Sequence, residues 1–147
     1  MDRHEPRFVH LSPTSLVEAA SKAKATLPRF REALGRPRRD GAFYGVKVHF
    51  ARAGGTEGWH IWLAVNDLFA DLYFCAPIEL PADFVGLAMG ESKLVTDEEV
   101  EDWIILDGGT LHGGFSLRAF REQLPAAERA GYDSYMGVTD YAGEGVA

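Results

Sequence analysis

The residues best suited to chemistry lie in a short stretch that begins with Asp102-Trp103 and ends with Gly113-Gly114 and Arg118. Adjacent glycines let a ligand approach backbone amides closely, and the start of a helix favours an anion. The fork of Arg118 fits a carboxylate or a phosphate, and Asp102 has the chemistry of a general base. In a purely structural alternative, Asp102 and Arg118 pair with each other and fix the end of the sheet. We favour this structural interpretation.

A second polar group, formed by Lys47, His60 and Trp62, lies in the middle of the chain. These side chains are predicted to share one face of a β-hairpin, where an exposed tryptophan suits a contact surface and His60 is an alternative general base. His49, His60 and His112 are candidate metal ligands, because imidazoles opposite each other on a hairpin can share an ion. The sequence places no carboxylate beside these histidines, so we expect no metal ion there. We also expect no other cofactor.

A hairpin must position this second group. Residues 43–51 and 58–65 alternate apolar and polar side chains, as half-buried strands do, and Gly54-Gly55 suits a two-residue turn between them. A longer loop would shift the register of the two strands. The two-residue turn predicts these cross-strand pairs: Phe50 with Trp59, His49 with His60, Val48 with Ile61, and Lys47 with Trp62.

A long first helix and a shorter last helix must cover these strands. Serine and proline at 12–13 start the first helix, whose apolar stripe is interrupted by Pro28, where we expect a kink or a restart. Ser116 is the predicted N-cap of the last helix, and one more helical turn follows it. Further short strands are expected at residues 70–76, 91–95, 103–106 and 110–112.

These elements predict one α+β domain that covers residues 1–147. We expect a bent antiparallel sheet of about five or six strands, with the long N-terminal helix and the C-terminal helix packed against it. A partly open barrel is the alternative arrangement of the same strands. The core is expected at residues 12–131, with residues 1–11 and 132–147 as loosely ordered tails.

Composition narrows the class of partner. A net charge of −7 argues against nucleic acid or an anionic membrane, because both need a dense basic surface. The one concentrated basic run, at residues 36–39, is predicted to be a solvated linker. Cys75 is the single cysteine, which excludes an intrachain disulfide, and its apolar strand predicts an inert core thiol. The start lacks the apolar core of a signal peptide and no apolar run is long enough to span a bilayer, so we expect a cytoplasmic protein.

Several short motifs follow one another between roughly residues 15 and 124: Leu27-Pro28-Arg29-Phe30, Val46-Lys47-Val48, His60-Ile61-Trp62-Leu63, Pro77, Gly90-Glu91, Asp102-Trp103 and the stretch from Gly113 to Arg118. In this order they resemble the YegJ-like bacterial family, catalogued as domain of unknown function 2314. The resemblance implies a small α+β domain and no established activity. Two departures stand out: Trp59 occupies the place of an expected glutamate, with Glu57 two residues earlier, and the segment from Pro77 to Gly90 is longer.

Together these observations favour a non-enzymatic binding or interaction module with a protein partner, and they leave its oligomeric state open. The negative net charge favours a basic partner, such as a toxin neutralised by an immunity-type inhibitor. The alternative is a small enzyme that acts on an anionic metabolite, with Asp102 or His60 as general base and Arg118 as anchor. An enzyme would point those three side chains into one pocket, whereas a binding module would show a flat apolar patch rimmed by acids.

Overall fold

The computed structural model describes residues 13–51 and 58–143. Over that part of the chain it contains three α-helices, one 3-10 helix and one open sheet of seven strands in the order β4-β3-β2-β1-β5-β6-β7. All neighbouring strands are antiparallel except β6 and β7. The predicted α+β class is confirmed, with seven strands instead of five or six. The elements are α1 (Pro13–Leu34), β1 (Phe43–Ala51), β2 (Gly58–Phe69), β3 (Leu72–Pro77), β4 (Lys93–Val95), η1 (Asp97–Glu99), β5 (Val100–Asp107), β6 (Thr110–Gly113), α2 (Phe115–Gln123), α3 (Ala126–Met136) and β7 (Asp140–Tyr141).

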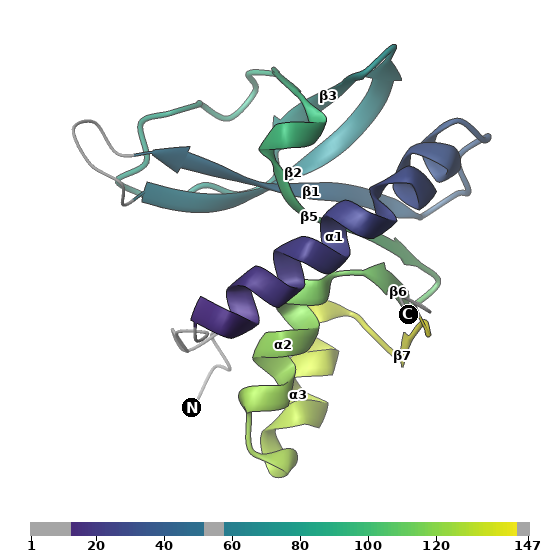
Figure 1. Cartoon of the computed structure of the whole chain (residues 1–147), viewed down its shortest axis with the longest axis vertical. Coiled ribbons are helices and arrows are strands. Elements are labelled where there is room, and N and C mark those ends of the chain that lie inside the picture. The colour runs from purple at the N-terminus through teal and green to yellow at the C-terminus, as the bar shows by residue number, and fades with distance from the viewer. Residues whose placement is uncertain (1–12, 52–57, 144–147) are drawn as a thin grey trace.

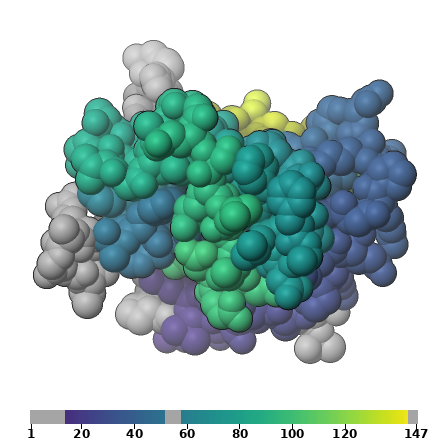
Figure 2. Space-filling view, turned by 90° about the horizontal axis from the view of Figure 1, so that it is seen from above, coloured from purple at the N-terminus to yellow at the C-terminus, as the bar shows by residue number. Residues whose placement is uncertain are grey.

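Helix α1 crosses one face of the sheet, and α2 and α3 lie beside each other below it (Figure 1). Ala23, Leu27 and Phe30 recur at steps of four and three, so one stripe of α1 faces the strands and is buried. The ring of Phe30 stacks on that of Trp103 with centroids 5.4 Å apart. Pro28 lies inside this helix, which runs without interruption from Pro13 to Leu34. Seen from above, α1 follows the lower border of the molecule, and the teal to green segments from β2 to β5 face the viewer (Figure 2).

The predicted register of the β1–β2 hairpin is confirmed. Lys47 lies opposite Trp62 and His49 opposite His60, and the other two predicted pairs also form. The proposed turn at residues 54–55 lies outside the described residues. Because side chains alternate along a strand, Val46 and its neighbours at every second position face α1, while Lys47 and His49 point to the other side.

We call this other side of β4, β3, β2, β1 and the start of β5 the open face. Its side chains alternate with the core residues, and each of them is half-buried or exposed. Helix α3 and the residues after it cover the sheet only at the β5–β6 end, where Val138 packs against Ile104 and Leu111. The open face is defined by Lys47 and His49 of β1, His60, Trp62 and Phe69 of β2, Phe74 of β3, Leu94 of β4 and Glu101 of β5.

The C-terminal part of the domain differs from the prediction of a tail that begins at residue 132. Helix α3 continues to Met136, and Asp140–Tyr141 forms β7 against β6. Arg121 of α2 holds Asp133 through two hydrogen bonds of 2.7 and 2.8 Å, and the Tyr141 hydroxyl donates to the same carboxylate at 2.6 Å. A bidentate arginine–carboxylate pair is among the strongest polar contacts in proteins, and it orders this segment.

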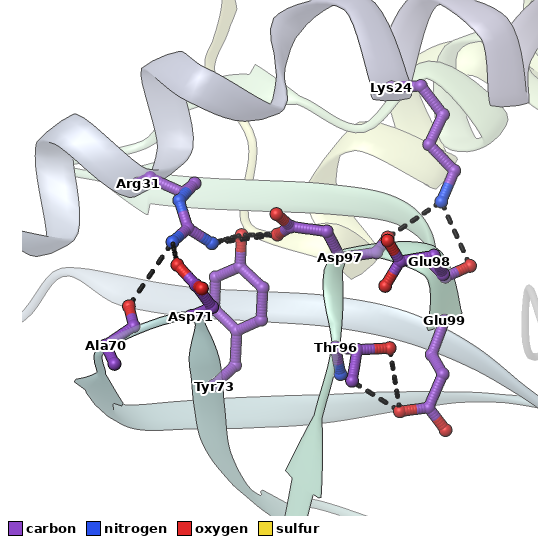
Figure 3. A network of polar contacts seen from close by, with 9 residues as sticks. All are labelled: Lys24, Arg31, Ala70, Asp71, Tyr73, Thr96, Asp97, Glu98 and Glu99. Atoms are coloured by element: carbon purple, nitrogen blue, oxygen red, sulfur yellow. Dashed lines mark hydrogen bonds and ion pairs between the residues drawn. The ribbon is translucent and has the colours of Figure 1, made fainter.

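A polar network fastens the other edge of the sheet to α1 (Figure 3). Arg31 of α1 pairs with Asp71 at 3.0 Å and with Asp97 at 2.9 Å. The hydroxyl of Tyr73 donates to the Asp97 carboxylate at 2.6 Å, and burial together with this bond raises the pKa of Tyr73. Lys24 donates to two carbonyl oxygens of η1. The short strand β4 is therefore held in place by α1 as well as by β3.

Candidate binding face

Asp102 has a structural position, because its carboxylate caps the N-terminus of α2. One oxygen accepts from the backbone N–H groups of Trp103 at 2.9 Å and Phe115 at 3.1 Å. The other accepts from the N–H of Ser116 at 2.8 Å and from its hydroxyl at 2.6 Å. Burial raises the pKa of Asp102, against the opposing effect of these donors and of Lys47. With a side chain that is 1% exposed, Asp102 is poorly placed to take a proton from a substrate.

The same contacts correct the predicted start of the last helix. We expected Ser116 to be the N-cap, but α2 begins at Phe115 and Gly114 occupies the cap position. The capping side chain comes from Asp102, thirteen residues before Phe115. A carboxylate at this end of a helix is favoured by the exposed N–H groups and by the helix dipole.

Trp103 and the glycine pair also belong to the framework. Trp103 is 1% exposed, and its indole N–H donates to the Thr26 hydroxyl of α1 at 3.0 Å. Gly113 and Gly114 have φ angles of 71° and 66°, which glycine adopts without strain. A Cβ on Gly113 would lie 2.3 Å from the carbonyl oxygen of Trp103, so the close approach requires glycine. These residues join β5, β6 and α2.

Arg118 does not form the predicted ion pair with Asp102. Its guanidinium donates to the carbonyl oxygens of Gly113 at 2.7 Å, Leu111 at 3.1 Å and Ala142 at 2.9 Å. These three bonds tie α2 to β6 and to the residues after β7. The structural interpretation of this corner is thus supported, but Asp102 and Arg118 act through separate sets of partners.

The polar part of the open face is held together by side-chain contacts. Nδ1 of His60 lies 2.6 Å from a carboxylate oxygen of Glu101, and the rings of His49 and His60 stack with centroids 4.7 Å apart. The ammonium of Lys47 lies 5.9 Å from the centre of the Trp62 ring. All four side chains that these contacts join on β1 and β2 (Lys47, His49, His60 and Trp62) were predicted from the sequence to share this face. Glu101, which lies on a strand distant in sequence, was not.

A β-bulge explains the position of Glu101. Lys47 pairs with Asp102 and the next residue, Val48, pairs with Val100, so Glu101 is the extra residue of β5. Burial alone raises the pKa of Glu101, but the hydrogen bond and charge of His60 and the charges of Lys47 and His49 outweigh it, and the net pKa is lowered. The carboxylate of Glu101 thus offsets the positive charge of Lys47 on the open face.

The histidines do not form the metal site that was considered. His112 of β6 pairs with Ile105 and lies on the α1 side of the sheet, away from His49 and His60. Within residues 13–51 and 58–143, no three histidine, cysteine or acidic side chains are grouped so that they could hold a metal ion. Cys75 is fully buried, and burial raises the pKa of its thiol to about 12, in keeping with an inert core cysteine.

The apolar part of the open face lies at the β4 edge. Phe69 is 51% exposed and Leu94 is 49% exposed. Phe74 joins them, because its ring contacts Phe69 with centroids 5.9 Å apart and its backbone pairs with Leu94. Asp67, which is exposed, pairs with Phe74 on the neighbouring strand. The alternation of Phe74 with buried Tyr73 and Cys75 was the available sequence signal for this patch.

Comparison with known proteins identifies the class of protein. The model of the family DUF2314, described as an uncharacterized protein conserved in bacteria, matches residues 14–140, and the chain belongs to that family. The chain is also similar to a putative ankyrin repeat protein of Neisseria meningitidis serogroup B (strain ATCC BAA-335 / MC58). The two are 31% identical over 100 residues, which make up 65% of this chain and 39% of that protein. The chain therefore matches well under half the length of that relative. No solved structure matches the chain. None of the helices in the described part of the chain is long and apolar enough to cross a membrane.

Proposed function

We propose that this domain is a non-enzymatic binding module, and that a basic protein docks on its open face. The observation that carries the proposal is the exposed apolar cluster of Phe69, Phe74 and Leu94 beside the exposed carboxylate of Asp67. Apolar patches of this kind on a soluble domain are typical of interaction sites, and a polar rim gives them specificity.

The charge distribution supports a basic partner. Residues 58–117 contain eleven acidic residues, one lysine and no arginine, although the whole chain has a net charge of only −7. Four of these acids lie away from the open face or are buried: Asp71 and Asp97 pair with Arg31 of α1, Asp107 pairs with Arg39, and Asp102 is in the core. This segment contains most of the sheet, and Figure 2 shows the part of the surface where its teal to green residues face the viewer. Such a field attracts a cationic surface and speeds its association. An immunity-type inhibitor that neutralises a basic toxin would use this property.

The comparisons are compatible with the proposal. The relative in Neisseria meningitidis is named a putative ankyrin repeat protein, and ankyrin repeats form extended binding surfaces. We further propose that the chain lies in the YegJ-like part of its family, on the Asp102-Trp103 motif and the stretch from Gly113 to Arg118.

The enzyme alternative receives less support from the geometry. It requires Asp102 or His60 as general base and Arg118 as anchor around one substrate. Asp102 is buried with both oxygens occupied, His60 is held by Glu101, and Arg118 donates to three backbone carbonyls. These three groups therefore do not meet around one substrate position, as the enzyme alternative requires.

Two matched variants test the binding face. Leu94 on the open face and Leu16 on α1 are 49% and 48% exposed, so Leu94→Ser and Leu16→Ser remove the same exposed group from different surfaces. Tagged wild-type and variant chains would be purified from the native host after mild cross-linking, and the attached proteins quantified. We expect the wild type and Leu16→Ser to retain the same basic protein, and Leu94→Ser to retain about tenfold less.

Salt provides a second readout, since a partner attracted by charge must be released as ionic strength rises. Equal retention by Leu94→Ser and Leu16→Ser would place the interface elsewhere. Retention of an acidic protein that is insensitive to salt would contradict the charge argument. A wild-type chain that retains nothing under either condition would contradict the binding-module proposal itself.

A further inference from the structure

A cleft of about 570 Å³ lies on the α1 side of the sheet, separated from the open face by the strands. It lies between the C-terminal half of α1 and the strands β1, β5 and β6. Its wall includes Tyr44, Trp103 and Ile105, which belong to the apolar core or pack against it. Clefts of this size with an apolar wall and a few charged groups are typical of small-molecule sites.

Arginines surround this apolar wall in an otherwise acidic protein. Arg29 of α1 and Arg36 and Arg39 of the basic run after it line the cleft, together with two acids, Glu32 and Asp107. The basic run at residues 36–39, predicted to be a solvated linker, thus lies at the edge of the cleft. Its guanidinium groups are planar forks that match the geometry of a carboxylate or phosphate.

The ion pairs of this rim are of the exchangeable kind. Arg36 pairs with Glu32, and the two side chains are 68% and 70% exposed. Arg39 pairs with Asp107, with side chains 76% and 26% exposed. Ion pairs this exposed contribute little to stability, so either arginine can turn toward an anion without loss of the fold.

We propose that this cleft binds a small organic anion with an aromatic body. The aromatic group lies against Tyr44 and Ile105, and the carboxylate or phosphate group binds to Arg36 and Arg39. Each half of the ligand matches one part of the cleft. A free inorganic anion would make no favourable contact with the apolar wall, and a neutral aromatic compound would not bind to the arginines of the rim. This site is independent of the binding face, because it uses none of the residues that define it.

Phenyl phosphate is a suitable probe, with inorganic phosphate and phenol as its two halves. Each would be titrated into the full chain while the amide shifts of the ¹⁵N-labelled protein are followed. We expect saturable shifts with phenyl phosphate at Tyr44, at Ile105 and in residues 36–39, and about tenfold weaker binding of either half. The double variant Arg36→Gln/Arg39→Gln is expected to bind phenyl phosphate about tenfold more weakly.

The matched controls are Lys22→Gln, which removes a cation of the exposed surface of α1 outside the cleft, and Leu94→Ser on the open face. Both are expected to leave phenyl phosphate binding unchanged. Equal weakening per removed charge by Lys22→Gln and by the double variant would reduce the effect to net charge and overturn the proposal. So would shifts spread outside the cleft, equal binding of phenyl phosphate and inorganic phosphate, or no saturable shift up to about 10 mM, where even millimolar affinity is visible.

Discussion

Replacement of Asp102 by asparagine gives the most direct test of how this fold is held together. The change keeps the size and shape of the side chain but removes its charge and one of its two acceptor oxygens. In the wild type both oxygens accept two hydrogen bonds each, from Trp103, Phe115 and Ser116. The asparagine amide oxygen can take over one pair of donors, and its NH₂ group then faces the N–H of Ser116.

Two opposing effects decide the size of the change. The Ser116 hydroxyl can turn and accept from the new NH₂ group, but its backbone N–H loses its acceptor, at a cost of about 1–3 kcal/mol for a buried donor. Loss of the negative charge at the N-terminus of α2 adds about 0.3–1 kcal/mol. Burial raises the pKa of Asp102, so an uncharged side chain removes some desolvation cost. We expect a net destabilisation of about 2 kcal/mol.

Urea unfolding at pH 7, followed by circular dichroism, measures this difference. The midpoint should fall while the slope stays constant, since the exposed surface on unfolding is unchanged. Asp107→Asn is the matched control, because the same change is made on the same strand in a carboxylate that pairs with the mostly exposed Arg39. We expect it to alter stability by less than about 1 kcal/mol. If Asp102→Asn lowers the stability no more than Asp107→Asn, the hydrogen bonds of Asp102 give no net stabilisation. That result would refute the claim that its capping of α2 stabilises the fold.

Two further predictions concern the same half of the molecule. Gly113→Ala is expected to destabilise the protein by at least about 2 kcal/mol, because its Cβ would lie 2.3 Å from the carbonyl oxygen of Trp103 at a φ of 71°. Gly90→Ala, at a φ of 90° with nothing within 4 Å, isolates the cost of the backbone conformation at about 1–2 kcal/mol, and equal losses would contradict the steric argument. The hydrogen bonds from Arg121 lower the pKa of Asp133, so its contribution to stability is complete above the unfolded pKa near 3.9 and is lost as pH falls through the folded pKa. Thermal unfolding between about pH 6 and pH 3 should therefore show a smaller decline for Asp133→Asn than for the wild type, and parallel curves would oppose this assignment.

The sequence allowed a good prediction of the framework near the hairpin. The two-residue turn assumed at Gly54-Gly55 gave the predicted register of β1 and β2. The alternation of their side chains gave the division into two faces, because side chains of neighbouring strands must share a core. The apolar stripe predicted for α1 includes Ala23, Leu27 and Phe30, which are buried over the sheet, but it also includes Leu16, which is 48% exposed. For the two faces and for the buried part of the stripe, a local period in the sequence determines the contact.

Contacts that depend on irregular geometry were not predictable. Glu101 reaches His60 only because of the bulge between β1 and β5, and the pattern of apolar residues contains no signal for that extra residue. Asp102 caps α2 from a different strand, so a search for a local N-cap selected Ser116 instead. The tail after residue 132 lacks a strong apolar period, and its order comes from the pairing of Asp133 with Arg121 and Tyr141.

The motifs that carry the family resemblance have mainly structural contacts. Asp102 caps α2, Trp103 binds Thr26 of α1, and Gly113 permits the close passage of β6 over Trp103. Arg118 closes the same corner through backbone carbonyls. A chain that keeps these residues keeps the fold, whatever it binds. Membership of the family therefore predicts the framework of this domain. Its specific partner must be sought among residues outside the motifs, such as Phe69, Phe74 and Leu94 of the open face and Arg36 and Arg39 of the cleft.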